Sequence, residues 1–356
     1  MGWVGEEHGL TLTVWLVLDL ISGVRAESGS SLRVLLVHIS PRELPSFVRQ
    51  DLELLRENFA VTPFFFRGRA DIPRLFKEVA RHDLAICWFT WDNAYYASWA
   101  AALFRRPMIT IPAGFDVVAL PEINYGNLLR KNSLRRTRSA LDRADLVLAA
   151  SDSLRRDASR LTGREDIRLV YLGFDSNYFP FGTEDRRGVL TVGDVTISNL
   201  DRKGMRTFVR AAAHAKDEPF WVAGRVYPEA LEAVGYIPDN VKFLGWLPQS
   251  ELLSLMQRAS VYVQVSAHEG FGCSLAEAML CGCIPVVTNR GAIPEVVGDE
   301  GVYVEYGQPV ETAEGIRRGL QSPVSLRSRV RERIVSRFPI RRRKEALAGA
   351  VRELIG

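Results

Sequence analysis

The stretch that decides the fold is Val261-Tyr-Val-Gln-Val-Ser-Ala-His-Glu-Gly-Phe-Gly-Cys-Ser-Leu-Ala-Glu-Ala-Met-Leu-Cys-Gly-Cys-Ile-Pro-Val-Val287. Its β-branched and aromatic start predicts a strand over residues 261–265, followed by a glycine loop and a helix that begins near Ser274. Free backbone N–H groups and the positive end of the helix dipole converge at such a helix start and attract anions. Gly270 and Gly272 let the backbone approach a ligand closely.

Two carboxylates, Glu269 and Glu277, stand on either side of this helix start. Ser274 and Glu277 could together form only a capping box, in which the two side chains bond to backbone N–H groups. That interpretation leaves Glu269, in the loop ahead of the helix, without a role. Two carboxylates separated by a loop and a helical turn can instead face one ligand from two sides, one at a sugar hydroxyl and the other at a ribose.

The alternation of strands and helices extends over the rest of the chain from Leu32 onward. Short β-branched runs followed by helical patterns are typical of parallel sheets covered by helices on both faces, so the predicted fold class is α/β. A turn-rich stretch from Leu172 to Gly182 interrupts the alternation and is interpreted as an interdomain connection. Strands are predicted near residues 33–39, 61–66, 84–89, 108–112, 146–149 and 168–171, and then near 189–192, 220–223, 241–243, 261–265, 284–287 and 302–304.

Length and composition agree with two folded domains. The chain has 356 residues, whereas one domain usually has about 100–200. Hydrophobic residues make up 47% and charged residues 25%, which is the balance of a folded protein. A net charge of +4 favours anionic substrates or membrane surfaces but is too small to indicate nucleic-acid binding. The longest predicted first-domain helix, near residues 128–143, carries the basic side chains Lys131, Arg135 and Arg138, which offer either a solvated face or a peripheral membrane contact.

The cysteines and acidic residues show no metal-binding pattern. Cys87, Cys273, Cys281 and Cys283 lack paired C-x-x-C spacing, and no D-x-D triplet occurs in the chain. We therefore expect neither a metal nor another cofactor, and we interpret the cysteines as small buried residues in a reducing compartment.

Residues 1–30 are predicted to form an N-terminal extension outside the fold. Their apolar run is too short to span a bilayer, which takes about 20 residues. A secretory signal is the alternative, although Glu6 and Glu7 stand where a signal peptide has basic residues. The predicted location of the chain is cytoplasmic, with the inner membrane face as a peripheral alternative.

The segment around Glu269 resembles the E-x(7)-E signature of family 4 of the retaining glycosyltransferases, which have the GT-B fold of two facing Rossmann-like domains. Glu269 and Glu277 occupy the two Glu positions, and Gly282 and Pro285 to Val287 match the end of the motif. The resemblance implies that the backbone of Phe271, Gly272 and Cys273 contacts the donor diphosphate. It implies further that Glu269, as the catalytic residue, meets the transferred sugar and that Glu277 meets the ribose.

Further landmarks of the family occur in the expected order. Gly193 and Asp194, followed by Arg202, Lys203 and Gly204, resemble the G-R…K-G segment whose cations neutralise the diphosphate, with Asp194 at the usual Arg position and Arg202 or Arg225 as the replacement. The segment 241–248 resembles the one that brackets the nucleobase, with Gly245, Trp246 and Leu247 as its wall. The implied organisation is an acceptor domain over residues 31–172, a donor domain over 173–340 and a C-terminal helix over 341–356 that crosses back to the first domain.

The first domain matches the family less closely. Residues 111–116 keep Gly114 and Asp116 of an H-G-x-D motif but have Ala113 at the His position. His38, at the end of the first strand, and Asp116 are candidates for the acceptor side. Aromatic residues at the end of the third strand offer an acceptor platform or fill the core beneath a helix; they are Trp88, Trp91, Tyr95 and Tyr96, with Asp92 among them.

The predicted activity is the retaining transfer of a hexose-type sugar from a UDP- or GDP-linked donor to a hydroxyl of a polysaccharide, a glycolipid or a small glycoside. The alternatives are a sugar-nucleotide epimerase of the same fold and a non-catalytic subunit that binds nucleotide sugars. A dinucleotide-dependent oxidoreductase is disfavoured, because Leu275 occupies the place of the third glycine of its motif.

Overall fold

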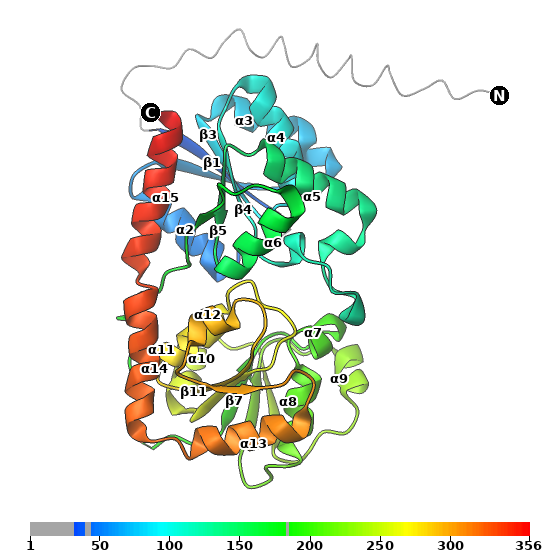
Figure 1. Ribbon diagram of the computed structural model, residues 1–356, viewed down its shortest axis with the longest axis vertical. Helices are drawn as coiled ribbons and strands as arrows, with labels where there is room; N and C mark the ends of the chain where they lie inside the picture. The colour runs from blue at the N-terminus through cyan, green and yellow to red at the C-terminus, as the bar shows by residue number, and fades with distance from the viewer. Residues whose placement is uncertain (1–31, 40–43, 183–184) are drawn as a thin grey trace, which may run out of the picture.

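Two parallel β-sheets organise the part of the chain described by the computed structural model, which comprises residues 32–39, 44–182 and 185–356. Figure 1 shows two α/β domains, one above the other, with helices against the faces of each sheet. The predicted α/β class is confirmed. The extension predicted over residues 1–30 lies outside the described residues.

The sheet of the first domain has the strand order β2-β1-β3-β4-β5-β6, and all its neighbouring strands are parallel. The central strand β3 is buried along its whole length, because helices cover both faces of the sheet. Edge strand β2 has only one fully buried residue, Phe64. The strands are β1 (Arg33–His38), β2 (Ala60–Phe65), β3 (Leu84–Trp88), β4 (Met108–Ile111), β5 (Leu146–Ala149) and β6 (Arg168–Leu169).

The helix predicted near 128–143 is shorter than expected at its start. A 3-10 turn, η5 (Asn127–Leu129), comes first, and the extended backbone of Arg130 separates it from the α-helix. The α-helices of the first domain are α2 (Ser46–Arg56), α3 (Ile72–Arg81), α4 (Asp92–Phe104), α5 (Lys131–Arg143) and α6 (Asp152–Thr162), and its other 3-10 turns are η2 (Arg69–Asp71), η3 (Phe115–Val117) and η4 (Pro121–Ile123).

The second domain repeats the architecture with the strand order β12-β11-β10-β7-β8-β9. Strand β10 is central and lies between β11 and β7, so the loop that follows it emerges in the middle of the sheet edge. The strands are β7 (Val189–Val192), β8 (Phe220–Ala223), β9 (Val241–Gly245), β10 (Val261–Gln264), β11 (Ile284–Thr288) and β12 (Val302–Val304). The helices are α7 (Ile197–Arg202), α8 (Met205–Ala212), α9 (Pro228–Val234), α10 (Gln249–Arg258), α11 (Cys273–Leu280), α12 (Ile293–Val297), α13 (Pro309–Leu320), α14 (Val324–Arg337) and α15 (Ile340–Ile355).

The last two helices run along one side of both domains (Figure 1). Helix α14 packs on α11 and α12 of the second domain, whereas α15 packs on α2 of the first. One face of each of these helices is buried and carries apolar residues such as Ile334 and Leu347. Arg343 of α15 is also buried and forms an ion pair with Asp51 of α2, at 2.6 Å.

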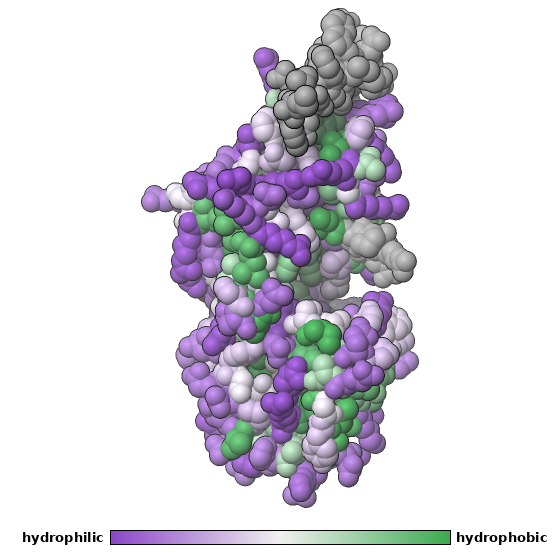
Figure 2. All heavy atoms as spheres, turned by 90° about the vertical axis from the view of Figure 1, so that its right-hand side faces the viewer, coloured by the Kyte–Doolittle hydropathy of each residue, from purple (hydrophilic) through white to green (hydrophobic). Residues whose placement is uncertain are grey.

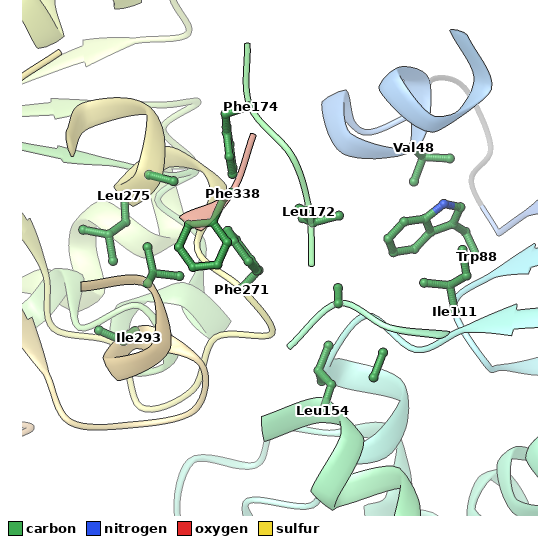
Figure 3. Close-up of a cluster of buried hydrophobic side chains, with 14 of the residues drawn as sticks. Val48, Trp88, Ile111, Leu154, Leu172, Phe174, Phe271, Leu275, Ile293 and Phe338 are labelled. Carbon is green, nitrogen blue, oxygen red and sulfur yellow. The ribbon is translucent and has the colours of Figure 1, made fainter. Parts of the chain in front are cut away.

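The chain passes between the domains twice at one place. Phe174 donates its backbone N–H to the carbonyl oxygen of Phe338 (2.9 Å), and Ile340 donates to the carbonyl of Phe174 (3.1 Å). In Figure 3, Phe174 and Phe338 lie with Phe271 on the second-domain side, and Leu172 lies between this group and Trp88 of the first domain. The two crossings therefore join the hydrophobic cores of both domains.

Candidate functional site

A cleft of about 360 Å³ lies between the two domains, at the carboxyl ends of strands from both sheets. Open α/β sheets bind their ligands at this edge. The first-domain wall consists of Ser46, Phe47, Trp88, Ala113, Ala150 and Leu154; the second-domain wall consists of Val192, Lys203, Gln249, Leu252, residues 269–274 and Glu277; Leu172 of the interdomain connection joins the two.

The start of helix α11 faces this cleft. The helix begins at Cys273, and Gly272 precedes it in a left-handed conformation with φ of 100°, which favours glycine. The first N–H groups of a helix have no partner within it, so they are available to an anionic ligand. The alternative capping box is wrong: Gly272 occupies the N-cap position, and the Ser274 hydroxyl accepts a hydrogen bond from Tyr262 (2.9 Å).

Phe271 ties this loop to the junction between the domains. Its backbone borders the cleft, while its side chain is buried. The ring stacks on Phe174, with centroids 5.8 Å apart, and meets Phe338 edge-on at 5.3 Å. The two chain crossings thus fix the position of the loop ahead of α11.

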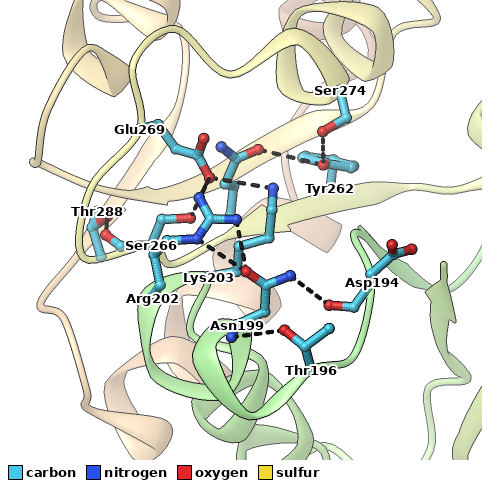
Figure 4. Close-up of polar contacts among 11 residues, drawn as sticks. Asp194, Thr196, Asn199, Arg202, Lys203, Tyr262, Ser266, Glu269, Ser274 and Thr288 are labelled. Atoms are coloured by element: carbon cyan, nitrogen blue, oxygen red, sulfur yellow. Dashed lines mark hydrogen bonds and ion pairs between the residues drawn. The ribbon is translucent and has the colours of Figure 1, made fainter. Parts of the chain in front are cut away.

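Glu269 lies in the loop ahead of α11, and nearby cations stabilise its ionised carboxylate. The ammonium of Lys203 donates to its Oε1 (3.3 Å), and the Ser266 hydroxyl donates to the same oxygen (3.0 Å), as Figure 4 shows. Burial alone would raise the pKa of Glu269, but Lys203, Arg202 and the Ser266 hydrogen bond outweigh it and lower the pKa below its usual value. Glu269 is therefore ionised at neutral pH.

Glu277, one helical turn into α11, has the opposite electrostatic environment. Burial raises its pKa to about 7, and no cation offsets the burial. Both carboxylates line the cleft, yet one is a fixed anion and the other titrates near neutral pH. Such divergence between two carboxyl groups is typical of functional sites.

Lys203 lines the cleft because the opposite loop leaves space for it. A Cβ atom on Gly193, which follows β7, would lie 2.7 Å from Cδ of Lys203. Any larger residue at position 193 would displace the lysine. Gly193 therefore contributes to the cleft indirectly, by leaving room for the side chain of Lys203.

The second cation expected from the sequence does not reach the cleft lining. Arg202 donates two hydrogen bonds to Oδ1 of Asn199 (2.8 and 3.0 Å) and lies 3.7 Å from Glu269. Arg225 is exposed and donates its backbone N–H to Asp194 (2.8 Å), so Asp194 has a structural role at the usual Arg position. Among the described residues, Lys203 is the one basic side chain in the cleft lining.

The three residues predicted as the nucleobase wall lie outside the described lining of the cleft. Gly245, Trp246 and Leu247 are absent from the described lining of the cleft, and Trp246 is 62% exposed. Gln249 and Leu252, one turn further on in α10, line the cleft instead. The loop after β9 could be found from the sequence, but which of its side chains turn inward depends on how α10 packs.

The acceptor-side predictions have different outcomes. Asp116 is fully buried, and its carboxylate accepts backbone N–H bonds from Thr90 (2.6 Å) and Gly114 (2.8 Å), so it shapes the loop after β4 and lies outside the described lining of the cleft. His38 is buried, and burial lowers its pKa to about 4. The indole of Trp88 donates to Asp51 (3.0 Å) within the core.

Two other aromatic residues near β3 also pack within the first domain. Tyr95 contacts Trp99, with ring centroids 6.5 Å apart, and Tyr96 contacts Phe66, at 6.0 Å. Trp91 is half-buried and contacts Phe115, at 5.4 Å. Of the predicted aromatic platform, Trp91 is thus the member that does not pack against the hydrophobic core.

Tyr125 lacks a recognisable motif in the sequence, although it reaches the second domain. The Arg202 guanidinium lies 5.3 Å from its ring centroid, and the His268 ring lies at 6.5 Å. Burial raises the pKa of Tyr125 to about 12. No local pattern announces this contact, because it forms only when the two domains face each other.

The described residues contain no metal cluster and no membrane span. No three or more His, Cys, Asp or Glu residues among them lie together in a group that could hold a metal ion. No described helix is long and apolar enough to cross a membrane. The four cysteines, all of them described, are free thiols.

Known proteins resemble part of the chain in sequence. Residues 186–322 match the family model described as glycosyl transferases group 1. The O-antigen chain mannosyltransferase B of Escherichia coli is 29% identical over 190 residues, which are 47% of this chain and 49% of that protein. The N-acetyl-alpha-D-glucosaminyl L-malate synthase of Bacillus anthracis is 29% identical over 234 residues, 59% of this chain and 57% of that protein. The aligned region thus spans less than two thirds of either relative.

Solved structures match almost the whole chain in fold. HepE of Anabaena, crystallised in complex with UDP-glucose, has a TM-score of 0.74 and 19% identity, over 91% of this chain and 100% of that one. Sucrose-phosphate synthase of Thermosynechococcus elongatus also has a TM-score of 0.74 and 19% identity, over 91% of this chain and 99% of that one. These matches confirm the predicted GT-B fold.

Proposed function

Because residues 186–322 match the glycosyl transferases group 1 family, we propose that this chain is a retaining glycosyltransferase that moves a hexose from a nucleoside diphosphate sugar to a hydroxyl acceptor. The observation that carries the proposal is the convergence of the α11 start, Lys203, Glu269 and Glu277 on one interdomain cleft. The complexes of HepE with UDP and UDP-glucose support a nucleotide sugar as the donor and make UDP the first nucleotide to test.

In the proposed reaction, the bond between C1 of the sugar and the diphosphate oxygen breaks, and C1 forms a bond with the acceptor oxygen. The electron pair of the broken bond leaves with the diphosphate, and the acceptor hydroxyl releases its proton. The free N–H groups of α11 and the ammonium of Lys203 are placed to stabilise the growing negative charge, so the protein itself supplies the positive field. Glu269 holds the transferred sugar, and Glu277 accepts hydrogen bonds from the ribose hydroxyls.

The proposal includes a reducing, cytoplasmic location. All four cysteines are unpaired, and Cys87, Cys281 and Cys283 are buried. Burial also raises the pKa of the Cys281 thiol to about 12, which keeps it protonated and unreactive. Free, protonated thiols are typical of proteins that work where disulfides do not form.

The test is a thermal-shift screen against the common nucleoside diphosphates and their sugars. A ligand present at 100 times its Kd stabilises the folded state by roughly 2.7 kcal/mol, so the correct nucleotide should raise the Tm by several degrees. Glu277→Gln should weaken its binding by roughly 10- to 100-fold, since a hydrogen bond to a charged acceptor contributes about 1.5–3 kcal/mol. Glu251→Gln, on the exposed side of α10, is the matched control and should bind normally. The absence of a shift with every nucleotide would contradict the proposal.

Turnover separates the remaining alternatives. A transferase should release the nucleoside diphosphate faster when a hydroxyl acceptor is added, and NMR of the product should show the donor's anomeric configuration. An epimerase would change the sugar without any acceptor. A binding subunit would hold the nucleotide and give no product with any acceptor.

A further inference from the structure

An aromatic arc, defined as Trp91, Phe115 and Tyr125, adjoins the first-domain lining of the cleft, because Phe115 comes two residues after Ala113. The ring centroids of Trp91 and Phe115 are 5.4 Å apart, and those of Phe115 and Tyr125 are 5.2 Å apart. All three residues follow the carboxyl ends of β3 and β4, and all three are only partly buried. They therefore keep exposed aromatic surface at the edge of the sheet that faces the second domain.

The arc ends beside the group that holds Glu269. Tyr125 lies beneath the guanidinium of Arg202, which is 3.7 Å from Glu269. The same loop approaches the donor loop directly, because a Cβ on Gly270 would lie 2.2 Å from the carbonyl oxygen of Ala113. The arc thus continues the first-domain wall beyond Ala113, next to the carboxylate proposed to hold the transferred sugar.

The backbone is held in disfavoured conformations at both ends of the arc. Three non-glycine residues in the described part of the chain have positive φ, and two of them precede members of the arc. Phe89, with φ of 64°, comes two residues before Trp91, and Asn124, with φ of 49°, comes directly before Tyr125. A bulky residue such as Phe rarely adopts this conformation, and such outliers concentrate at binding sites.

We propose that the acceptor is a carbohydrate and that its ring stacks on the aromatic arc. The inference rests on the proposed transferase function and names the class of its acceptor. A pyranose ring has apolar C–H faces and a rim of hydroxyls, and the arc offers aromatic surface with charged groups at each end. Asp92, paired with Arg136 at 2.9 Å, follows Trp91, and Arg202 covers Tyr125. A lipid chain would find charged groups at both ends of a short apolar surface, which suits it poorly.

The first experiment measures binding without turnover. Methyl hexopyranosides are added to the full chain loaded with the nucleoside diphosphate identified by thermal shift, and saturation-transfer NMR is recorded with irradiation of the aromatic protons. We expect transfer to the ring protons of at least one glycoside. Trp91→Ala and Phe115→Ala should weaken it measurably, while Trp99→Ala should retain it in full, because Trp99 is exposed further along α4 and stacks on Arg143.

The second experiment measures transfer to the glycoside that binds. Each of Trp91→Ala and Phe115→Ala should raise the acceptor KM by about two- to tenfold, which corresponds to an aromatic contact of roughly 0.5–1.5 kcal/mol. The nucleotide Kd and the slow donor hydrolysis without acceptor should not change. Equal glycoside binding by these variants and by Trp99→Ala would overturn the inference, as would transfer to a glycerolipid or a hydroxyl peptide and to no glycoside. If the unsubstituted chain binds no nucleotide, that separate result contradicts the proposed function itself.

Discussion

The two walls of the cleft differ in charge. Among the described lining residues, the first-domain wall has no charged side chain, whereas the second-domain wall has Lys203, Glu269 and Glu277 together with a helix start. The first-domain edge instead presents aromatic side chains, from Phe47 in the cleft lining to Trp91 beyond it. The charged groups of the cleft are thus concentrated on one domain, and the other domain contributes apolar and aromatic surface.

This division fits a reaction in which one substrate carries all the charge. The donor diphosphate needs fixed positive groups, and a neutral acceptor needs a surface that orients it beside C1. The difference between the two walls also separates the expected consequences of mutation. Substitutions in the second-domain wall should act on donor binding and bond breaking, and those in the first-domain wall on the acceptor.

Lys203→Ala should have the largest effect on turnover. The ammonium is the one basic side chain among the described lining residues, so its loss leaves the departing diphosphate stabilised by the helix start alone. Removal of one preorganised donor typically lowers kcat by roughly 10²–10³-fold, and we expect a loss of that size in steady-state measurements of nucleoside diphosphate release.

Lys216→Ala provides the comparison for this variant, because Lys216 is exposed beyond the end of α8. It should keep normal turnover. A decrease of less than tenfold for Lys203→Ala would show that the charge is stabilised elsewhere, and the contrast between the two walls would then fail.

The next effect is a pH dependence from Glu277, whose pKa burial raises to about 7. Ribose hydroxyls donate to the carboxylate form, so affinity should fall as the group is protonated. From pH 8 to pH 6 the ionised fraction drops about tenfold, and calorimetry with the intact nucleotide sugar should show a similar loss of affinity. The intact donor is the better ligand, because the terminal phosphate of a free nucleoside diphosphate itself titrates near pH 6.

The stability of the ligand-free protein should change with pH in the opposite direction. The folded protein holds the Glu277 proton to a higher pH than the unfolded chain, so between about pH 4.5 and 7 the native state binds more protons. Stability must therefore fall as pH rises through that window. Glu277→Gln should remove both trends, and an unchanged pH profile of binding in this variant would assign the titration to another group.

The same contrast explains what the sequence could predict. The second-domain wall comes largely from one contiguous segment, and strand, glycine loop and helix follow from local patterns, so the place of Glu269 and Glu277 beside a helix start could be predicted from the sequence alone. All twelve predicted strands occur in the described residues, with ends that shift by two residues at most. Hydrophobic period and strand propensity are local properties of the sequence, and they are sufficient to locate the strands.

The first-domain wall depends on packing over long distances. Trp88 and Trp91 are three residues apart and look alike in the sequence. The indole of Trp88 nevertheless bonds within the core to Asp51 of α2, which also forms an ion pair with α15. Tyr125 contacts Arg202 of the other domain, and that contact forms only when the two domains face each other. The motif around Trp246 predicts the base wall, whereas the lining of the cleft by Gln249 depends on how α10 packs. Side-chain direction in a loop is not encoded by a local pattern.

The smallest effect concerns the contact that holds the two walls opposite each other. Glu295 of α12 accepts the backbone N–H bonds of Asp152 and Ser153, at 2.7 Å each, so a second-domain carboxylate caps helix α6 of the first domain. Loss of such a cap costs about 0.5–2 kcal/mol, and Leu154 on the same helix turn lines the cleft. Glu295→Ala should therefore lower turnover by a few-fold and speed hydrogen exchange at the two amides by about tenfold.

Glu300→Gln is the control for this variant. It also removes a carboxylate, one that pairs with Arg329 within the second domain, and it should leave turnover and hydrogen exchange unchanged. Faster exchange without any change in turnover would mean that the facing walls tolerate a looser α6, and that the charged wall alone limits the reaction.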